Sequence, residues 1–304
     1  MTPRLLITGW TGFLGRPCFH YARVAGIEVH AVARECHSLA STTAFTHSLD
    51  LFDTERVRLK LAEIRPTHLL HLAWIATPGV YWTSPENERW RIASRELLNT
   101  FAEVGGQRVA IAGTCAEYDR TGNGVCHEFD TPTQPSTPYG VAKNSLRLWA
   151  EAFGHSARIG IAWPRLFFLY GPREHPARLV PSVTNALLAG EPAECTAGTQ
   201  ERDFLHVDDA AAALVQLVLS DVTGPVNIGS GEAVSVRTVV ETIADIVGQP
   251  DLLRLGAKPM PPNDPPLLVA DVGRLRNEVK WAPRIGLRRG LEDTVAWWRG
   301  RNAG

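Results

Sequence analysis

The sequence predicts an α/β fold, a Rossmann-type doubly wound parallel sheet followed by a smaller mixed α/β lobe. Three observations support this prediction. Strand-like and helix-like segments alternate from Arg4 onward, as they do in parallel sheets with helices on both faces. A glycine-rich turn joins the first strand to the first helix, and the regular alternation loosens after Tyr170. We therefore expect a Rossmann-type domain at residues 1–170 and a smaller lobe at residues 171–304, with some segments returning to the main sheet.

Short apolar runs predict the strands of the first half, and apolar residues at helical spacing predict its helices. The predicted strands are Arg4–Thr8, Glu28–Ala33, His68–Trp74, Val109–Thr114 and Arg158–Phe167. The predicted helices are Gly12–Ala25, Asp53–Ile64, Glu88–Val104 and Pro138–Gly154. The strands at 68–74 and 109–114 are of the apolar kind that is buried on both faces. Residues 114–138 are rich in Gly, Thr and Pro and predict a long loop.

Prolines divide the second half into shorter elements. The helices predicted there are Leu179–Ala189, Asp208–Leu219, Val236–Val247 and Leu291–Arg299. We expect this half to lie over the C-terminal edge of the sheet, so that the two lobes share a cleft.

The composition is that of an ordinary globular chain, with 304 residues, 44% of them hydrophobic, and a formal net charge of -1. No basic block appears, so we expect no nucleic acid partner. No apolar stretch approaches the length of about 18 residues that a membrane helix needs, so we expect no membrane partner. Five cysteines without a C-x-x-C pair predict reduced thiols in a cytoplasmic protein. The histidines lack metal-ligand spacing, so no metal site is expected.

A glycine-rich turn follows the first strand and opens the first helix. It reads Gly9-Trp10-Thr11-Gly12-Phe13-Leu14-Gly15. Glycines allow a tight turn and a close approach of the backbone to a pyrophosphate, which the positive end of the helix dipole stabilises. The alternative is that they only make the turn possible. We predict a dinucleotide site that includes Gly9, Thr11, Gly12, Phe13, Leu14 and Gly15.

The G-x-x-G-x-x-G spacing resembles that of the extended short-chain dehydrogenase/reductase family, which includes nucleotide-sugar epimerases, dehydratases and ketoreductases. The resemblance spans nearly the whole chain. His71-Leu72-Ala73-Trp74 is similar to the family's H-L-A-A strand end, and residues 202–209 are similar to its R-D-[FY]-[IV]-H-V-x-D segment. Asp50-Leu51 resembles the pair that contacts adenine. The resemblance implies further cofactor contacts at Asp50, Leu51, Leu72, Ala73, Trp74, Leu166, Tyr139 and Lys143.

Tyr139 and Lys143 form a Y-x-x-x-K motif in a predicted helix. Residues four apart share a helix face, so the ammonium can lie beside the phenol and lower its pKa. Thr114, at the end of a buried strand, is placed to polarise the reacting carbonyl. The alternatives are a surface pair at one turn's spacing and a hydroxyl that caps a strand end. We predict that Thr114, Tyr139 and Lys143 are the catalytic residues.

The residues after Thr114 narrow the chemistry. In the 4,6-dehydratases that resemble this chain, an Asp–Glu pair stands where this chain has Cys115 and Ala116. In relatives that epimerise beside a ketone, a cysteine stands at the place of Ala116. Alanine transfers no proton, so hydride chemistry with Tyr139 as acid or base is what remains.

The end of the second strand bears on the cofactor. An acidic residue there would bind both ribose hydroxyls of NAD. Ala33 takes that place, and the following Arg34 could bind a 2′-phosphate. NADP(H) is therefore favoured over NAD(H). Glu35 is the alternative candidate, as an acid that would bind the ribose hydroxyls of NAD. The third possibility is that Arg34 and Glu35 are surface residues without a role in cofactor binding.

Arg202 is the main substrate candidate, because in the resembling family the arginine of this motif contacts the substrate's diphosphate. An ion pair with Asp203, Asp208 or Asp209 is the structural alternative. The resemblance departs at Phe168, where asparagine is usual, and at Pro261, where arginine is usual. The aromatic segment 77–87 is expected to wall the sugar pocket or to be a surface loop. The predicted substrate contacts are Tyr81, Cys115, Phe168, Arg202 and Asp264.

Together these features predict NADP-dependent reduction of a nucleotide-linked keto sugar, a 4-keto-6-deoxyhexose, by hydride transfer with Tyr139 as proton donor. The first alternative is a nucleotide-sugar 4-epimerase with tightly bound NAD. The second, from another class, is a dinucleotide-sensing protein without catalysis. We expect a homodimer formed through the helices near 88–104 and 138–154, as the family resemblance implies.

Overall fold

The structure, a computed structural model, describes residues 3–35, 44–119, 124–262 and 264–302. Within these ranges it confirms the predicted α/β class. The main sheet is parallel throughout, in the order β13-β8-β5-β4-β1-β2-β3 with β6 beside β8. In that order the strands are β13 (Gly224–Ile228), β8 (Gly160–Leu166), β5 (Arg108–Ile111), β4 (His68–His71), β1 (Arg4–Thr8), β2 (Glu28–Ala33), β3 (Ala44–Ser48) and β6 (Gly113–Thr114).

The direction of winding reverses beside β1. The chain passes from β1 to β2 and β3 on one side, and then returns to β4 on the other side of β1. At such a switch point the connections leave the carboxyl ends of the two strands in opposite directions, and a crevice opens between them. The fold therefore places a binding site beyond the ends of β1 and β4.

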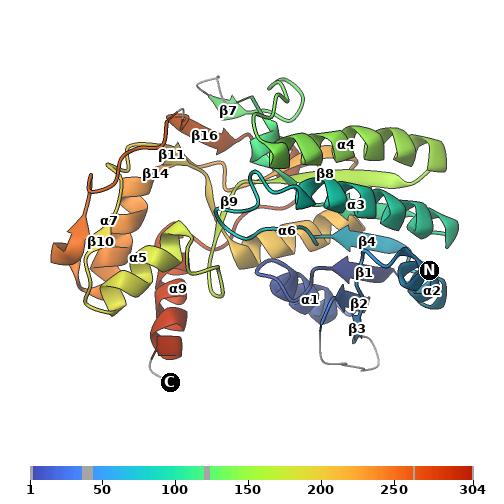
Figure 1. Ribbon diagram of the computed structural model, residues 1–304, viewed down its shortest axis with the longest axis horizontal. Coiled ribbons are helices and arrows are strands. Elements are labelled where there is room, and N and C mark those ends of the chain that lie inside the picture. The colour runs from blue at the N-terminus through green and yellow to red at the C-terminus, as the bar shows by residue number, and fades with distance from the viewer. Residues whose placement is uncertain (1–2, 36–43, 120–123, 263, 303–304) are drawn as a thin grey trace.

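Helices cover both faces of the main sheet (Figure 1). On one face lie α2 (Thr54–Ile64), α3 (Glu86–Glu103) and α4 (Pro138–Ala157). On the other face lie α1 (Gly15–Val24) and α6 (Val207–Leu219). Both faces of the strands are thus buried, which explains why these strands are apolar throughout rather than alternating.

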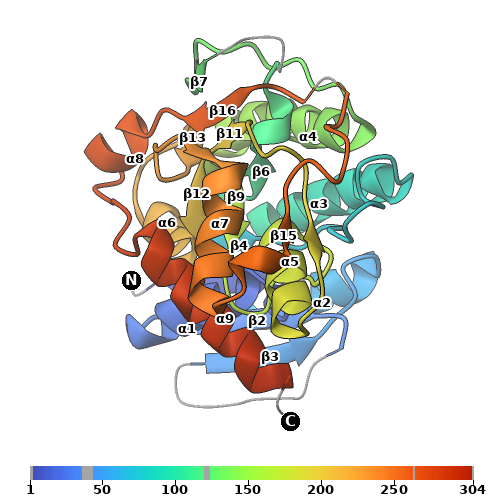
Figure 2. The ribbon, with the colours of Figure 1, turned by 90° about the vertical axis from the view of Figure 1, so that its left-hand side faces the viewer.

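The second lobe is built around three helices, which stand to the left in Figure 1 and face the viewer in Figure 2. They are α5 (Leu179–Leu188), α7 (Val236–Val247) and α9 (Leu287–Asn302), and they share one hydrophobic cluster. The short elements of the chain are β7 (Val125–Cys126), β9 (Phe168–Tyr170), β10 (Ala193–Glu194), β11 (Glu201–Arg202), β12 (Phe204–His206), β14 (Val234–Ser235), β15 (Leu253–Arg254), β16 (Leu267–Ala270), α8 (Gly273–Asn277), η1 (Cys115–Glu117) and η2 (Pro250–Leu252).

Short strands connect the two halves of the chain. β7 pairs in parallel with β16, which in turn pairs with β11, and β9 pairs with β12. The side chain of Asn227 on β13 adds to this link, because its Nδ2 donates to Cys126 O at 2.7 Å and to Asp271 O at 3.0 Å. The segment of α6 and β13 lies in the layers of the main sheet, while a domain boundary at residue 170 stays a prediction.

Three differences from the sequence-based expectations have physical causes. The first helix begins at Gly15 rather than Gly12, because residues 9–14 form the turn that precedes it. The predicted loop 114–138 contains the last residue of β6, together with η1 and β7, and β7 pairs with a strand far away in the sequence. β3 was not predicted, since Ala-Phe-Thr-His-Ser at the edge of the sheet is half polar. No helix in the described ranges is both long and apolar enough to span a membrane.

Candidate active site

The glycine turn is shaped by contacts that leave no room for side chains. Gly9 has φ +70°, and a Cβ on it would lie 2.9 Å from Ala73 N. A Cβ on Gly15 would lie 2.2 Å from Gly9 O, whereas one on Gly12 would lie 3.2 Å from that oxygen. Gly9 therefore lets the turn approach the end of β4, and Gly15 lets α1 start directly against the turn.

The start of α1 is open to an anion. No side chain in the described ranges caps this helix at Leu14. Arg16 N donates to Gly12 O at 3.2 Å and Pro17 has no N–H, so the N–H groups of Leu14 and Gly15 are the ones that this helix start offers to an anion. These N–H groups and the helix dipole favour negative charge at this position. A cradle of this kind fits the pyrophosphate of a dinucleotide.

A buried chain of hydrogen bonds fixes the switch point between β1 and β4. Thr8 Oγ1 lies 2.7 Å from His71 Nδ1, and His71 Nε2 lies 2.8 Å from Ser94 Oγ. Thr8 Oγ1 also accepts from the backbone N–H groups of Leu72 and Ala73, at 3.1 and 3.2 Å. Burial lowers the pKa of His71 to about 3, so the ring is neutral and acts as a structural link.

One cavity of about 910 Å³ lies beyond the strand ends and is lined by both lobes. It brings together every predicted site residue except Asp50, whose Oδ1 accepts from Phe52 N at 3.0 Å. The predicted residues in its lining are Gly9, Thr11, Gly12, Phe13, Leu14, Gly15, Arg34, Leu51, Leu72, Ala73, Trp74, Tyr81, Thr114, Cys115, Tyr139, Lys143, Leu166, Phe168, Arg202 and Asp264.

Thr114 is held from behind by a buried carboxylate. Glu117 Oε1 accepts from Thr114 N at 2.9 Å, and Thr114 Oγ1 accepts from Ala116 N at 3.2 Å. Glu117 is fully buried, forms an ion pair with Arg165 Nε at 3.0 Å, and accepts from Trp163 Nε1 at 2.9 Å. The end of β6 and the turn η1 are thereby locked in place, so Thr114 keeps one position at the cavity.

Lys143 is buried on α4 with two contacts. Its Nζ donates to Ala112 O at 2.8 Å and lies 3.7 Å from the centre of the Trp74 ring. Burial lowers the pKa of Lys143 to about 7, against the opposing effect of the Glu117 charge. Trp74, which stands at the last position of the H-L-A-A-like run, thus contacts the predicted catalytic lysine.

Tyr139 lies within an aromatic wall. Its ring meets the Tyr81 ring edge to face at 4.8 Å and the Trp82 ring at 5.7 Å. Burial raises the pKa of the Tyr139 phenol, and a hydrogen bond with the Thr114 side chain offsets part of that effect. The prediction of a lowered pKa for this phenol is wrong for this structure, because removal from water outweighs the other contributions.

Arg202 and Asp264, two of the predicted substrate contacts, both line the cavity. Arg202 is buried, and its Nη2 donates to Asp264 Oδ1 at 2.5 Å while its Nη1 donates to Pro265 O at 2.8 Å. The two predicted contacts, Arg202 and Asp264, are therefore partners of each other. The alternative pairing of Arg202 with Asp203 is not what the structure shows, since Asp203 accepts from Ser230 and from neighbouring backbone groups.

Two buried glutamates were not singled out from the sequence. Glu117 stands inside an apolar run, and an acid at such a position is a signal for a buried partner. Glu174 lies between β9 and α5, lines the cavity, and is 9% exposed. Its position five residues before a helix gave no periodic signal.

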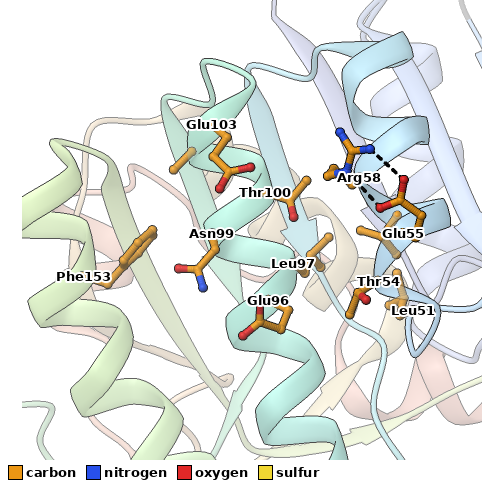
Figure 3. A pocket seen from close by; sticks show the side chains of 12 residues that line it. Leu51, Thr54, Glu55, Arg58, Glu96, Leu97, Asn99, Thr100, Glu103 and Phe153 are labelled. Atoms are coloured by element: carbon orange, nitrogen blue, oxygen red, sulfur yellow. Dashed lines mark hydrogen bonds and ion pairs between the residues drawn. The ribbon is translucent and has the colours of Figure 1, made fainter.

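A second cavity of about 450 Å³ lies between α2 and α3 on the outside of the fold (Figure 3). Its polar lining includes Glu96, Glu103 and the ion pair of Glu55 with Arg58, at 2.6 Å. Of the predicted site residues only Leu51 reaches it. Across the described ranges no group of three or more His, Cys, Asp or Glu residues could hold a metal ion.

Comparison with known proteins gives a family and full-length relatives. The model of the NAD dependent epimerase/dehydratase family matches residues 5–229. A "Probable UDP-glucuronate 4-epimerase" of Rhizobium meliloti is 24% identical over 97% of this chain and 96% of its own length. The UDP-glucose 4-epimerase of Azospirillum brasilense is 27% identical over 98% of this chain and 92% of its own length.

Solved structures share the fold over nearly all of the chain. UDP-glucose 4-epimerase of Thermotoga maritima, solved with UDP-glucose, superposes with a TM-score of 0.88 at 23% identity, covering 98% of this chain and 99% of its own. UDP-glucose 4-epimerase of Thermus thermophilus, in complex with NAD, superposes with a TM-score of 0.83 at 25% sequence identity, covering 98% of this chain and 99% of its own. MoeE5 in complex with UDP-glucose and NAD superposes with a TM-score of 0.82 at 31% sequence identity, covering 99% of this chain and 100% of its own.

These comparisons overturn the prediction of NADP(H). The Thermus thermophilus enzyme and MoeE5 were solved with NAD. The physical reason lies at Arg34, which sits in an exposed bend after β2. A planar guanidinium stacks on aromatic rings as well as pairing with phosphates, so an arginine here does not require a 2′-phosphate. The relatives likewise favour the 4-epimerase alternative over the reduction of a keto sugar.

Proposed function

Because this chain belongs to the NAD dependent epimerase/dehydratase family, we propose that it is a UDP-sugar 4-epimerase that keeps NAD in the cavity. Membership of the family also bears out the resemblance found in the sequence. One observation carries the proposal: Thr114, Tyr139 and Lys143 line the same cavity as the glycine turn, while Cys115 and Ala116 bring no carboxylate to it. Epimerisation at C4 needs only one proton-transferring group of this kind.

The residues present fit NAD. The glycine turn at Gly9 and the uncapped start of α1 form a cradle for the pyrophosphate. Leu51, which lines the same cavity as the turn, offers an apolar contact to the adenine, and Arg34 offers a guanidinium plane for stacking. When bound, NAD supplies reversible oxidation at the C4 carbinol and brings the positive charge of its nicotinamide ring into the cavity.

The residues of the chain then transfer one proton, that of the C4 hydroxyl group of the sugar. Tyr139 takes the proton of the C4 hydroxyl when the sugar is oxidised and returns it when the sugar is reduced from the opposite face. Thr114 shares a hydrogen bond with the Tyr139 side chain and orients the C4 oxygen. Burial raises the pKa of the Tyr139 phenol, so the phenolate that acts as the base needs positive charge beside it, which the bound nicotinamide and the protonated form of Lys143 would supply. Over the cycle the proton and the electrons both return to the sugar, so no net oxidation occurs.

The relatives support this proposal over the two alternatives. The dehydratases need an acid–base pair at the places of Cys115 and Ala116, which this chain lacks. A reductase must release its oxidised cofactor in every turnover, whereas the neighbours solved with cofactor hold NAD, the form that an epimerase starts from. A protein that only senses a dinucleotide has no use for the Thr–Tyr–Lys set.

The test is to incubate the purified protein with UDP-glucose and to follow both the product and the cofactor. We expect conversion to the C4 epimer without any change in nicotinamide absorbance, and release of about one NAD per chain after denaturation. Stoichiometric consumption of NADPH with a 4-keto sugar nucleotide, and no epimer from UDP-glucose, would contradict the proposal in favour of the reductase.

We also propose that the chain forms a homodimer through α3 and α4. These helices expose three large apolar side chains, Ile92, Val141 and Leu148, at 50%, 48% and 54%. Apolar groups that stay exposed on two adjacent helices are suited to burial against a second copy. Light scattering at micromolar concentration should give twice the mass of the chain, and a monomer would contradict the proposal.

A further inference from the structure

The indole ring of Trp74 lies against the Lys143 ammonium at the main cavity. Lys143 Nζ is 3.7 Å from the centre of the ring, and both residues line the cavity. The same Nζ donates to Ala112 O at 2.8 Å, so one hydrogen bond and one ring face hold the ammonium. Lys143 is only 3% exposed. Indole is the ring that attracts a cation most strongly, and the attraction is largest where water is excluded.

A buried asparagine fixes the orientation of this ring. Trp74 Nε1 donates to Asn87 Oδ1 at 2.8 Å. Asn87, near the start of α3, is 2% exposed, and its Nδ2 donates to Tyr81 O at 2.6 Å and to Ser84 O at 2.9 Å. Rotation of this amide would leave buried polar groups unpaired, which is costly. The plane of the indole is therefore set by the fold of the chain itself.

The segment that Asn87 holds also packs on Tyr139. Trp82 lies between the two residues whose carbonyls bond Asn87, and its O accepts from Tyr139 N at 3.1 Å. The Trp82 ring also meets the Tyr139 ring edge to face at 5.7 Å. Tyr139 and Lys143 are one turn apart on α4. A connected set of contacts thus runs from Lys143 through Trp74 and Asn87 to Tyr139.

Tryptophan at this position departs from the pattern that the strand end resembles. The H-L-A-A run has alanine at the place of Trp74. Alanine has neither a ring nor a side-chain N–H, so it could make neither the contact with Lys143 nor the hydrogen bond to Asn87. Both contacts are therefore features of this chain's own residue.

The charge on Lys143 depends on the groups around it. Burial lowers its pKa to about 7, against the opposing effect of Glu117 on η1, which is itself paired with Arg165 on β8. Two further titratable groups are His71 on β4, neutral because burial lowers its pKa to about 3, and Tyr139 on α4. A ring face attracts an ammonium group but not an uncharged amine, so the indole favours the protonated lysine.

We propose that Trp74 is a positioning residue for the reaction, which keeps Lys143 protonated at the cavity and ties it to the segment that packs on Tyr139. This inference rests on the proposed 4-epimerase function, in which positive charge supports the Tyr139 phenolate. Trp74 itself transfers neither a proton nor a hydride. It acts through Lys143, whose ammonium it holds in one place while Tyr139 takes and returns the proton of the sugar.

The test compares the wild type with Trp74→Leu, Trp74→Phe and Trp297→Leu, each as purified with its NAD. Leucine keeps an apolar side chain without a ring, and phenylalanine keeps a ring without the N–H. Trp297 on α9 is half-buried and lies outside the cavity lining, with its ring centre 5.4 Å from the Arg301 guanidinium. Trp297→Leu therefore removes the same kind of contact at another place. Far-ultraviolet circular dichroism checks that each variant is folded.

The first measurement is the pKa of Lys143, by nuclear magnetic resonance with isotope-labelled lysine. The chain has four lysines, and the signal of Lys143 is identified by its loss in Lys143→Met. In Trp74→Leu this pKa should fall by about one unit, the size expected for a desolvated contact of this kind. Trp74→Phe should lower it by about 0.3–0.5 units, because benzene is the weaker ring. Trp297→Leu should not change it.

An unchanged or raised pKa of Lys143 in Trp74→Leu overturns the proposal. If Trp74→Leu does not fold, Trp74→Phe decides in the same way, since an unchanged or raised pKa there also overturns it.

The second measurement is kinetic and separates positioning from a general loss of structure. In Trp74→Leu at about pH 8, kcat for UDP-glucose should fall by about 10-fold, because the protonated fraction of Lys143 falls by about that factor. KM should change by less than about 2-fold, and the alkaline limb of kcat should move to lower pH by about one unit. An equal loss of kcat at every pH contradicts the proposal.

The two measurements keep this inference apart from the proposed function. A lowered Lys143 pKa in Trp74→Leu without any epimer from UDP-glucose would overturn the proposed function and leave the effect of Trp74 on Lys143 established. Epimerisation of UDP-glucose with the same Lys143 pKa in the wild type and in Trp74→Leu would overturn only the inference about Trp74.

Discussion

Two walls of one cavity each bury a glutamate, Glu117 on the side of the main sheet and Glu174 on the side of the C-terminal lobe. Glu117 accepts from Thr114 and Trp163 and pairs with Arg165, all at about 3 Å. One oxygen of Glu174 has no partner in the described part of the chain. The first wall is thus complete in the protein alone. The second wall has a carboxyl oxygen that is free to bond a ligand. A rigid wall suits catalysis, and a wall with a free polar group suits selection of the substrate.

The largest effect is expected on turnover, from a substitution at Tyr139 on the side of the main sheet. Tyr139→Phe removes the proton-transferring group, so turnover should fall by about 100- to 10,000-fold. Binding of UDP-glucose should change little, since the ring remains packed against Tyr81. Single-turnover kinetics with calorimetry would separate the two quantities. Turnover at the wild-type rate would remove Tyr139 from the mechanism.

The next effect concerns stability. Glu117→Ala leaves Arg165 buried without its carboxylate, and breaking a buried ion pair in this way costs about 3–5 kcal/mol. The free energy of unfolding in urea should fall by that amount. Glu117→Gln keeps an oxygen that can accept from Thr114 N and should lose less. A Glu117→Ala protein as stable as the wild type would mean that the wall does not depend on this pair.

On the side of the C-terminal lobe, the free energy of unfolding should depend on pH through Glu174. The pKa of Glu174 is raised from 4.5 to about 8, so the folded protein holds a proton that the unfolded chain releases above about pH 5. Wild-type stability should therefore fall from about pH 5 to about pH 8 relative to Glu174→Gln. Unfolding midpoints of both proteins across this range test the difference. Parallel curves would mean that Glu174 ionises normally in the folded protein.

The smallest effect is expected at the adenine end of the cavity. Arg34 is exposed, and a stacking contact at an exposed site contributes about 0.5–1 kcal/mol. Arg34→Ala should weaken the binding of NAD by no more than that, as measured by titration of the protein stripped of cofactor. A loss of several kcal/mol would point to a desolvated charge contact and to a more enclosed site.

The sequence was most informative where local rules decide the structure. The glycine turn, the Y-x-x-x-K motif and the strand ends are short-range patterns, and the structure gathers all of these predicted residues except Asp50 in one cavity. Their functional roles stay predictions. What the sequence could not supply were pairings over long distances, such as β7 with β16 and Arg202 with Asp264, because neither partner carries a local signal of the other.

The direction of pKa shifts was a second limit. A lysine one helical turn from Tyr139 suggested a lowered pKa for the phenol, but burial raises it. The helical spacing was correct, and Lys143 is on the same helix. Its ammonium is engaged by Ala112 O and the Trp74 ring, contacts that depend on how α4 packs on the sheet. Burial follows from the whole fold, so no motif could have given this result.

The return of α6 and β13 to the main sheet has a consequence for how the chain can be divided. α6 buries nine side chains, most of them aliphatic, and packs on β4, β5 and β8. A fragment that stopped at residue 170 would leave β4, β5 and β8 without α6 on that face and would expose their apolar side chains to water and to other copies. The catalytic half thus depends on residues encoded after it, and the protein should unfold in a single cooperative transition rather than lobe by lobe.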